Sequence, residues 1–431
     1  MKHKNNKVAF CSLGCKVNQY ETNAMMQEFI NNGYEIKEFN EFANIYIINT
    51  CTVTNVADRK SRQMLRKVKE INPNAIVIAC GCYAQVGKKE LEQIDEIDII
   101  IGNNEKKEII KIIEDKVEEK VSDILHQNEY IEFGTTTFTE KTRAVVKIQD
   151  GCDRYCSYCI IPYARGKVRS RQLGNIVNEV EEIAQQGIKE IVITGIHIAS
   201  YGKDFDYAIT LIDVLEKLNT INGIERIRLG SLEPTIITER FINRLSKLEK
   251  VCPHFHLSLQ SGCDNTLKRM NRKYNTQEFD NGVNIIRKYY QNPTLTTDII
   301  VGFPGETGEE FEITYKFLEK VCFYKMHIFK YSQRKGTKAA IMPQQIDGKI
   351  KEDRSKKLIE LSNKNELNYN KMKIGEITQV LFEESDGQYY KGHTKDYYLV
   401  KTKDMGKNLE NKVIDVEIVE VKPEYLVGDI K

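Results

Sequence analysis

The sequence lacks the long apolar run that a membrane-spanning helix requires. No stretch approaches about 18 apolar residues, and the first residues, MKHKNNK, are not followed by the apolar region of a signal peptide. We therefore predict a cytoplasmic protein that does not engage a membrane.

A strong overall charge is also missing. The 64 Lys and Arg residues nearly balance the 62 Asp and Glu residues, which leaves a formal net charge of +2. Any surface for a nucleic acid must therefore be a local patch. The 431 residues are too many for one ordinary domain, so we expect two or three. Eleven cysteines in a reducing compartment favour metal binding or catalysis over disulfides.

Three of these cysteines stand close together after an apolar run at 144–148. Cys152, Cys156 and Cys159 have the spacing C-x3-C-x2-C. Thiolates ligate zinc and iron–sulfur clusters, and short spacings let one loop wrap one inorganic centre. A structural zinc ion would need a fourth ligand, and the nearest histidines, His126 and His197, are distant in sequence. Three ligands leave one coordination position open for a substrate. The alternative is a set of scattered structural cysteines.

The first 120 residues alternate between strand and helix patterns. Short apolar runs at 8–13, 45–49, 75–79 and 97–101 suit buried strands. Helical patterns at 21–31 and 58–70 separate them. This alternation predicts a parallel α/β sheet, whose ligands collect at the carboxyl ends of the strands.

A cysteine follows each of the first three predicted strands. Cys15, Cys51 and Cys82 would meet at one edge of the sheet, whatever their separation in sequence. That would be a second site with three thiolates. The residues alone barely distinguish Cys15 from Cys11, or Cys82 from Cys80, and buried structural cysteines remain the alternative for the whole set.

The central part of the chain repeats the alternation of strand and helix. After a polar segment at 121–142, apolar runs occur at 144–148, 190–194, 226–229, 254–259, 294–301 and 327–331. Helical patterns such as 174–186, 209–218 and 276–289 separate them. Six such units predict a partial (βα)6 barrel, open on one side, with the C-x3-C-x2-C loop on its catalytic face.

Two stretches could contact RNA. The first carries four cations at alternate positions, 165, 167, 169 and 171, which an extended chain would place on one face; a solvated basic loop is equally expected. The second is the carboxyl-terminal part, where strand patterns at 377–382, 388–392, 397–400 and 413–419 predict a small all-β barrel. Its tyrosines at 389, 390, 397 and 398 could stack on bases or fill the core.

The cysteine loop resembles the signature of the radical SAM enzymes. In that family the open iron of a 4Fe–4S cluster binds S-adenosylmethionine (SAM), which is cleaved to a 5′-deoxyadenosyl radical. The stretches GCKVNQYE at 14–21 and NTCTVT at 49–54 resemble the methylthiotransferases, a subgroup with a second, auxiliary 4Fe–4S cluster. The tail resembles the TRAM domain, an RNA-binding module.

The resemblance implies a set of site residues. It places the auxiliary cluster on Cys15, Cys51 and Cys82, and the radical SAM cluster on Cys152, Cys156 and Cys159. For the SAM pocket it implies the segment Thr194-Gly195. Glu233, Gln260 and Asp298, which stand at the ends of other predicted strands, and Tyr158 of the cysteine loop are further candidates for this pocket. The implied domains are 1–120, a linker at 121–142, a radical SAM core at 143–345, a connecting helix at 346–370 and a TRAM-like domain at 371–431.

The GCKVNQYE form is similar to the branch that adds a methylthio group to C2 of N6-threonylcarbamoyladenosine beside the tRNA anticodon. The implied partners are tRNA, an electron donor such as flavodoxin or ferredoxin, and a sulfur source. Sister branches act on isopentenyladenosine in tRNA or on a ribosomal protein. A non-catalytic protein with zinc in both cysteine sites is the alternative from a different class.

Overall fold

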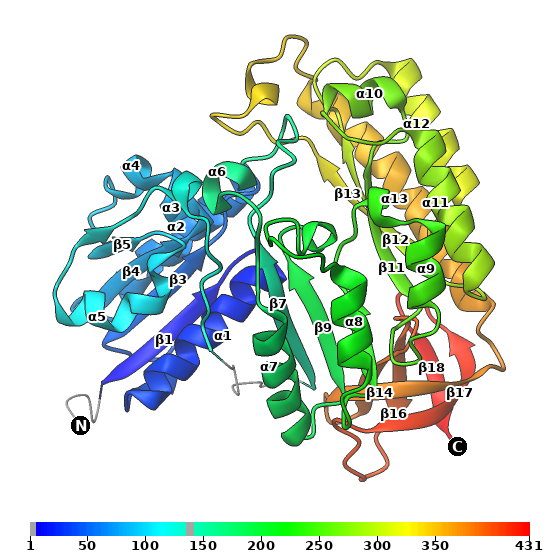
Figure 1. Ribbon diagram of the computed structural model, residues 1–431, viewed down its shortest axis with the longest axis horizontal. Coiled ribbons are helices and arrows are strands. Elements are labelled where there is room, and N and C mark those ends of the chain that lie inside the picture. Colours follow the sequence, from blue (N-terminus) through cyan, green and yellow to red (C-terminus); the bar gives the residue numbers. More distant parts are fainter. Residues whose placement is uncertain (1–5, 135–141) are drawn as a thin grey trace.

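The computed structural model describes residues 6–134 and 142–431, and Figure 1 shows three parts in sequence order. The amino-terminal part is a parallel sheet of six strands in the order β2-β1-β3-β4-β5-β6. Its strands are β1 (Lys7–Ser12), β2 (Glu35–Lys37), β3 (Ile45–Thr50), β4 (Ile76–Gly81), β5 (Ile99–Ile101) and β6 (Glu119–Lys120). Its helices are α1 (Lys16–Asn31), α2 (Asn55–Ile71), α3 (Cys82–Val86), α4 (Lys88–Leu91) and α5 (Ile109–Glu114).

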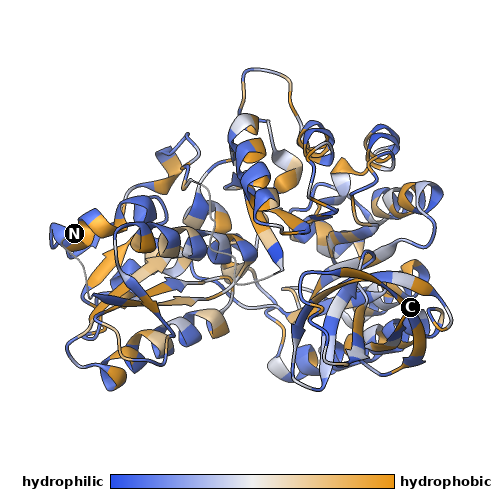
Figure 2. Cartoon of the chain, turned by 90° about the horizontal axis from the view of Figure 1, so that it is seen from below, coloured by the Kyte–Doolittle hydropathy of each residue, from blue (hydrophilic) through white to orange (hydrophobic). Residues whose placement is uncertain are grey.

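This sheet is buried on both faces, as parallel sheets are. Every residue of β3 is buried, and separate apolar clusters lie on the two sides of the sheet. Figure 2 shows the apolar strands between helices with hydrophilic outer faces. All four predicted strands are present, as β1, β3, β4 and β5. The edge strands β2 and β6 escaped prediction because they are short and carry exposed, charged residues.

The central part is the predicted partial barrel. Its strands are β7 (Arg143–Asp150), β9 (Glu190–Gly195), β10 (Arg226–Leu229), β11 (His254–Gln260), β12 (Thr294–Val301) and β13 (Lys325–Lys330). They form two parallel sheets, β10-β9-β7 and β11-β12-β13, and isolated bridges connect the β10 region to the β11 region. The six strands therefore follow one another in chain order. The short β8 (Arg169–Ser170), antiparallel to β7, was not predicted.

Helices cover the outside of this barrel around one large core. They are α7 (Leu173–Gln185), α8 (Leu211–Asn219), α9 (Glu239–Leu245), α10 (Asp264–Arg269), α11 (Thr276–Tyr289), α12 (Gly308–Val321) and α13 (Gly348–Lys371). The short helix α6 (Ile161–Arg165) instead lies beside α3 of the amino-terminal part. Helix α13 packs along β13 and adds Leu358 and Leu361 to the core. No helix in the described ranges is long and apolar enough to cross a membrane.

The segment before the barrel lies partly outside the described residues, which omit 135–141. Its described portion contacts the barrel. The Tyr130 hydroxyl donates a hydrogen bond to the carbonyl of Lys147 at 3.1 Å, and Glu132 pairs with Arg171. A 3-10 turn at Ile124–His126 is the regular element between 121 and 134.

The carboxyl-terminal part is a closed barrel of five strands in the order β14-β15-β16-β18-β17. The strands are β14 (Ile377–Ser385), β15 (Tyr389–Thr394), β16 (Leu399–Lys403), β17 (Val413–Val421) and β18 (Leu426–Ile430). Strand β18 was not predicted. Of the two roles considered for the tyrosines, Tyr390 and Tyr398 fill the core, because both rings are buried in this barrel. Tyr389 is exposed.

Candidate active site

The C-x3-C-x2-C loop lies at the carboxyl end of β7. Gly151 turns the chain there with φ of +69°, and a Cβ at this position would lie 1.7 Å from the carbonyl oxygen of Lys167. The amide of Cys159 donates to the carbonyl of Cys156 at 2.9 Å, which closes a turn. The sequence therefore folds into a tight loop that holds three cysteines on the expected face of the barrel.

The surroundings of this loop suit thiolate ligands. Burial raises the pKa of Cys152 to about 11 and, with the neighbouring Cys156, raises the pKa of Cys159 to about 12. The free thiols are therefore neutral at physiological pH, and metal binding would release their protons. Arg272 donates from Nη1 to the Cys156 sulfur at 3.1 Å, so a partly buried cation already faces the position where negative charge would develop.

The three other candidate ligands meet at the edge of the amino-terminal sheet. Cys15 precedes α1, Cys51 follows β3 and Cys82 begins α3, so all three lie at the carboxyl ends of the adjacent strands β1, β3 and β4. Burial, with the neighbouring sulfurs of Cys82 and Cys15, raises the pKa of Cys51 to about 12. Gly14 has φ of +94°, and a Cβ there would lie 2.6 Å from the Cys51 sulfur.

The structure also separates these cysteines from their neighbours in sequence. Cys80 is fully buried within β4, and its sulfur donates to the carbonyl of Ile48 at 3.6 Å. Cys11 lies within β1 and packs against one apolar cluster of the sheet. Cys15, by contrast, is exposed.

Arg165 connects the two cysteine sites. Its Nε donates to the Cys82 sulfur at 3.3 Å, and its Nη2 donates to Glu21 at 3.0 Å and to Asn18 at 2.6 Å. The same guanidinium faces Asp150, next to the C-x3-C-x2-C loop, at 3.3 Å. The side chain is fully buried. A single cation thus links a candidate ligand of the amino-terminal sheet to the end of β7.

This arrangement contradicts one interpretation of the basic stretch at 165–171. Arg165, Arg169 and Arg171 do not share an exposed face but are buried within ion pairs. Only Lys167 of the four is exposed. Acidic partners elsewhere in the fold, such as Glu21 and Glu179, take the place of phosphate.

Three of the six residues predicted for the SAM pocket line one small cavity. Tyr158, Gln260 and Asp298 border a cavity of about 200 Å³, together with Val53 and Thr54 of the amino-terminal part. Val53 and Thr54 follow Cys51, and Tyr158 precedes Cys159. Residues next to both cysteine sites therefore border the same cavity, which we name the small cavity.

The other three residues predicted for the SAM pocket lie at strand ends outside the small cavity. Glu233 pairs with Arg154 of the cysteine loop and accepts a hydrogen bond from His197 Nε2 at 3.1 Å. Although burial opposes it, the hydrogen bond from His197 and the charge of Arg272 lower the pKa of Glu233 to about 2. Gly195 approaches the β7 backbone closely, with room for no Cβ, and Thr194 is buried beside it.

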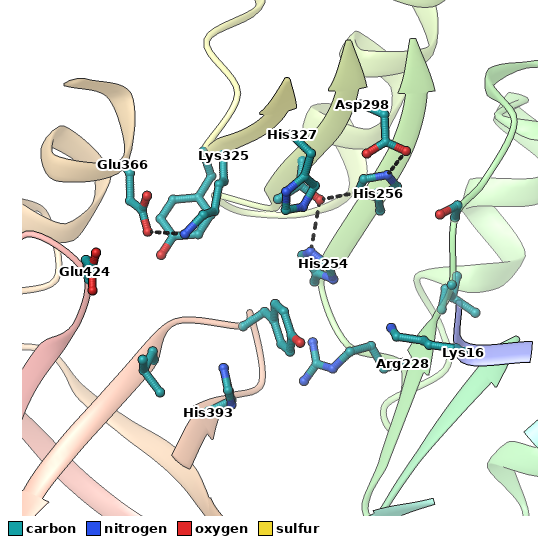
Figure 3. A pocket seen from close by; sticks show the side chains of 17 residues that line it. Lys16, Arg228, His254, His256, Asp298, Lys325, His327, Glu366, His393 and Glu424 are labelled. Carbon is teal, nitrogen blue, oxygen red and sulfur yellow. Dashed lines mark hydrogen bonds and ion pairs between the residues drawn. The ribbon is translucent and has the colours of Figure 1, made fainter. Parts of the chain in front are cut away.

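A larger cavity of about 470 Å³, which we name the central cavity, lies inside the barrel (Figure 3). Asp298 lines both cavities. The basic residues of the central cavity are Lys16, Arg228, His254, His256, Lys325, His327 and His393. Sequence reasoning missed them, although alternate positions of β11, β12 and β13 carry polar side chains where a buried strand would be apolar. This alternation along the strands is the sequence pattern that could have identified a polar interior.

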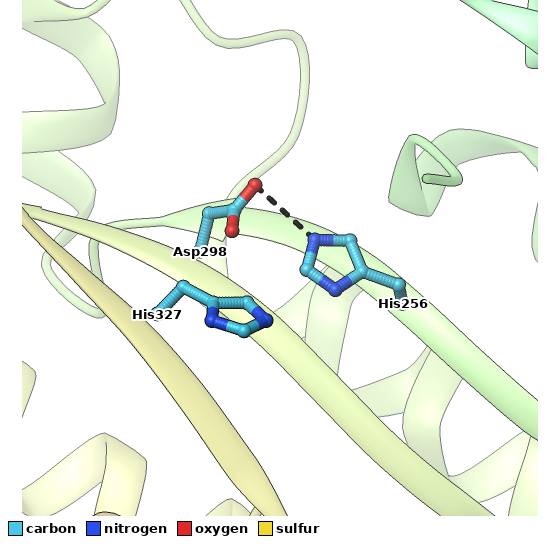
Figure 4. A group of neighbouring side chains, drawn as sticks. All are labelled: His256, Asp298 and His327. Carbon is cyan, nitrogen blue, oxygen red and sulfur yellow. Dashed lines mark ion pairs between the residues drawn. The ribbon is translucent and has the colours of Figure 1, made fainter. Parts of the chain in front are cut away.

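The central cavity contains a tight group of possible metal ligands, His256, Asp298 and His327 (Figure 4). Their ligand atoms all lie within 4.8 Å of one another, and no other group of three in the described ranges is that tight.

The spacing of the cysteines can be compared with that of a zinc site. Four sulfurs around one zinc ion would lie about 3.8 Å apart, given Zn–S bonds of about 2.3 Å. Among the described residues, neither set of three cysteines has its sulfurs within 4.8 Å of one another.

Comparisons with known proteins agree with this geometry. Residues 146–318 match the radical SAM superfamily, and residues 7–102 match a family described as uncharacterized protein family UPF0004. Threonylcarbamoyladenosine tRNA methylthiotransferase MtaB of Bacillus subtilis is 39% identical over 98% of this chain and 95% of its own length. MtaB of Aquifex aeolicus is 42% identical over 88% and 93%.

The chain belongs to the radical SAM methylthiotransferase family. It is also similar to a tRNA-2-methylthio-N(6)-dimethylallyladenosine synthase of Alkaliphilus oremlandii, with 34% identity over 99% of this chain and 93% of that protein. A radical SAM methyltransferase from Kitasatospora setae, TsrM, shares the fold, with a TM-score of 0.59 and 14% identity over 78% of this chain and 77% of that one.

Radical SAM methylthiotransferases are enzymes that transfer methylthio groups and use SAM and two 4Fe–4S clusters. The donor sets here fit that requirement, with three cysteines at each of two sites and an arginine donating to a sulfur at each. When bound, these cofactors supply the radical and the sulfur that polar side chains cannot supply. The protein supplies binding, orientation and electrostatics.

Proposed function

We propose that this chain adds a methylthio group to C2 of N6-threonylcarbamoyladenosine at position 37 of tRNA. The observation that carries the proposal is the small cavity, because residues adjacent to both cysteine sites border it. Group transfer requires the reacting atoms to be held within near-contact distance. The names of the relatives support the substrate, since three relatives named MtaB are 36–42% identical over nearly the whole chain.

The proposal gives each cysteine site one task. Cys152, Cys156 and Cys159 hold the cluster at which SAM is cleaved, and Cys15, Cys51 and Cys82 hold the auxiliary cluster that provides or positions sulfur. When bound, one SAM would supply the radical that removes hydrogen from C2, the auxiliary cluster would supply the sulfur that bonds to C2 in its place, and a second SAM would supply the methyl group for that sulfur. Thr194, Gly195, Tyr158, Glu233, Gln260 and Asp298 remain our proposed residues for the SAM pocket.

The same proposal assigns the domains and partners. Residues 1–120 carry the auxiliary cluster, 143–345 form the radical SAM core, and 371–431 form a TRAM-like RNA-binding domain after the helix at 346–370. A flavodoxin or ferredoxin would supply electrons, and a separate sulfur source would restore the auxiliary cluster. Because tRNA is the substrate, we expect the enzyme to act in the cytoplasm.

Deleting the gene and analysing digested tRNA nucleosides by mass spectrometry tests the substrate. We expect 2-methylthio-N6-threonylcarbamoyladenosine to disappear and its unthiolated precursor to accumulate. Restoring the wild-type gene should restore the product, and restoring a C152A variant should not. Persistence of this nucleoside, with loss of the 2-methylthio isopentenyl derivative or of a ribosomal protein mark, would assign the chain to a sister branch.

A further inference from the structure

The wall of the central cavity is most positive at the end where Lys16 and Arg228 lie. The wall contains Lys16, Arg228 and Lys325, together with four histidines. Two of its three carboxylates are already engaged, since Lys325 pairs with Glu366 at 2.9 Å and His256 pairs with Asp298 at 3.1 Å. The third, Glu424, is exposed. Lysines and arginines on the wall therefore equal the carboxylates in number, and an anionic ligand is favoured only at the Lys16 end of the cavity.

Among the described lysines and arginines that line the central cavity, Lys16 lacks a carboxylate partner. It is the first residue of α1, directly after the candidate ligand Cys15, and its side chain reaches toward Arg228 across the cavity wall (Figure 3). No carboxylate within residues 6–134 and 142–431 forms an ion pair with it, although it remains accessible to solvent inside the cavity. A ligand carboxylate could pair with this ammonium group without displacing a protein carboxylate from it.

Arg228 adds to the positive field even though it has a partner. Its guanidinium pairs with Glu190 at 2.7 Å, but the same carboxylate also faces Arg143 at 4.0 Å and Arg226 at 3.9 Å. One buried carboxylate therefore serves three guanidiniums, and only Arg143 has a second acidic partner, Glu383.

The carboxyl-terminal barrel completes the wall and fixes Arg228. The Tyr397 ring lies 4.5 Å from the Arg228 guanidinium and is stacked on His393 with ring centroids 4.6 Å apart. Tyr397 has φ of +75°, a conformation that non-glycine residues rarely adopt without a local reason. Tyr397 lies in the connection between β15 and β16, and this backbone conformation accompanies a ring that lines the central cavity.

We propose that the central cavity binds the threonyl carboxylate of N6-threonylcarbamoyladenosine and that Lys16 recognises that carboxylate. The inference rests on the proposed function, because it concerns the group that distinguishes this substrate from isopentenyladenosine. The isopentenyl group is apolar and uncharged, whereas the threonyl group ends in a carboxylate. A volume of about 470 Å³ is within the usual range of small-molecule sites.

The position of the cavity also suits the reaction. In adenine only N1 separates C2 from C6, which bears the N6 substituent, and the exocyclic bonds at C2 and C6 diverge. A substituent held in the central cavity would therefore direct C2 away from Lys16. Asp298, which lines both cavities, marks where the base would pass from one to the other. A divalent cation at His256, Asp298 and His327 is the less favoured occupant, because the lysines and Arg228 of the same wall would repel it.

The test compares two anticodon stem-loop RNAs on reconstituted holoenzyme, one with N6-threonylcarbamoyladenosine and one with its threonyl methyl ester. We expect wild-type enzyme to prefer the acid by about 10- to 100-fold in kcat/KM for methylthiolation. The K16M variant should lose that preference, by becoming slower on the acid and unchanged on the ester. Equilibrium binding of the two RNAs should show the same change in ratio, and iron per chain should stay at the wild-type value.

The matched control is K364M, at an exposed lysine of α13 away from the cavity, which should keep the wild-type preference. K16R should restore most of it, because the charge is retained. Equal losses of K16M on acid and ester, or an unchanged preference, would overturn the role of Lys16 while leaving the proposed function intact. A wild-type enzyme that modifies neither RNA but modifies the isopentenyladenosine RNA would overturn the proposed function itself.

Discussion

Replacing Cys152 with alanine is expected to reduce SAM cleavage to the background rate, whereas replacing Cys15 with alanine should leave cleavage and abolish methylthiolation. The two residues belong to separate sites, one at the end of β7 and one at the edge of the amino-terminal sheet. Under the proposed division of tasks, only the first site is needed to form 5′-deoxyadenosine. The measurement is the anaerobic yield of 5′-deoxyadenosine and of the methylthio nucleoside in one reaction.

Cys322 provides a matched control, because it is exposed at the end of α12 and belongs to neither site. The C322A variant should retain both yields. A C15A variant that loses SAM cleavage as completely as C152A would show that the sites do not act separately. A C152A variant that still forms 5′-deoxyadenosine would remove the cysteine loop from the cleavage step.

Replacing Glu21 with glutamine is expected to destabilise the protein by about 3–5 kcal/mol, the usual cost of leaving buried charges without their partner. Glu21 is buried and pairs with Lys106 at 2.5 Å, with Lys147 at 2.7 Å and with Arg165. Although burial opposes it, these three cations, Arg165 first, hold the pKa of Glu21 well below its usual value. Glutamine has nearly the same shape but no charge. Lys147 and Arg165 would keep Asp150 as an acidic partner, whereas Lys106 would lose the carboxylate with which it pairs.

The consequence extends to the active site, because Glu21 and Lys106 come from the amino-terminal part, and Lys147 and Arg165 from the barrel. The network thus fixes the two cysteine sites relative to each other. Urea unfolding under anaerobic conditions measures the change, and the exposed Glu182 on α7 provides the control variant E182Q. A loss below about 1 kcal/mol for E21Q, similar to that of a surface pair, would contradict this role.

The sequence predicted those strands and sites that short stretches of neighbouring residues define. Strands such as β3 are runs of buried, β-branched residues, and the cysteines that follow three strands had to meet at one edge of a parallel sheet. The short strands β2, β6 and β8 have little apolar content, so pairing with a neighbour rather than composition defines them.

The surroundings of the site depended on contacts that sequence spacing does not reveal. The alternating arginines at 165–171 are typical of a solvated face, yet Arg165 meets Glu21, which lies 144 residues earlier. Lys16 was visible only as part of a resemblance, and its place in the central cavity comes from the packing of α1 beside β7. Tyr390 and Tyr398 were expected to stack on bases or fill the core, and only the closed barrel places them inside.

The iron content of anaerobically reconstituted protein tests most directly whether two separate cysteine sites each hold a cluster. We predict about eight iron atoms per chain for the wild type, as two 4Fe–4S clusters require, and about four for each triple alanine variant. One variant removes Cys15, Cys51 and Cys82, and the other removes Cys152, Cys156 and Cys159. Zinc in place of iron, or the loss of all iron from one triple variant with no loss from the other, would contradict the account.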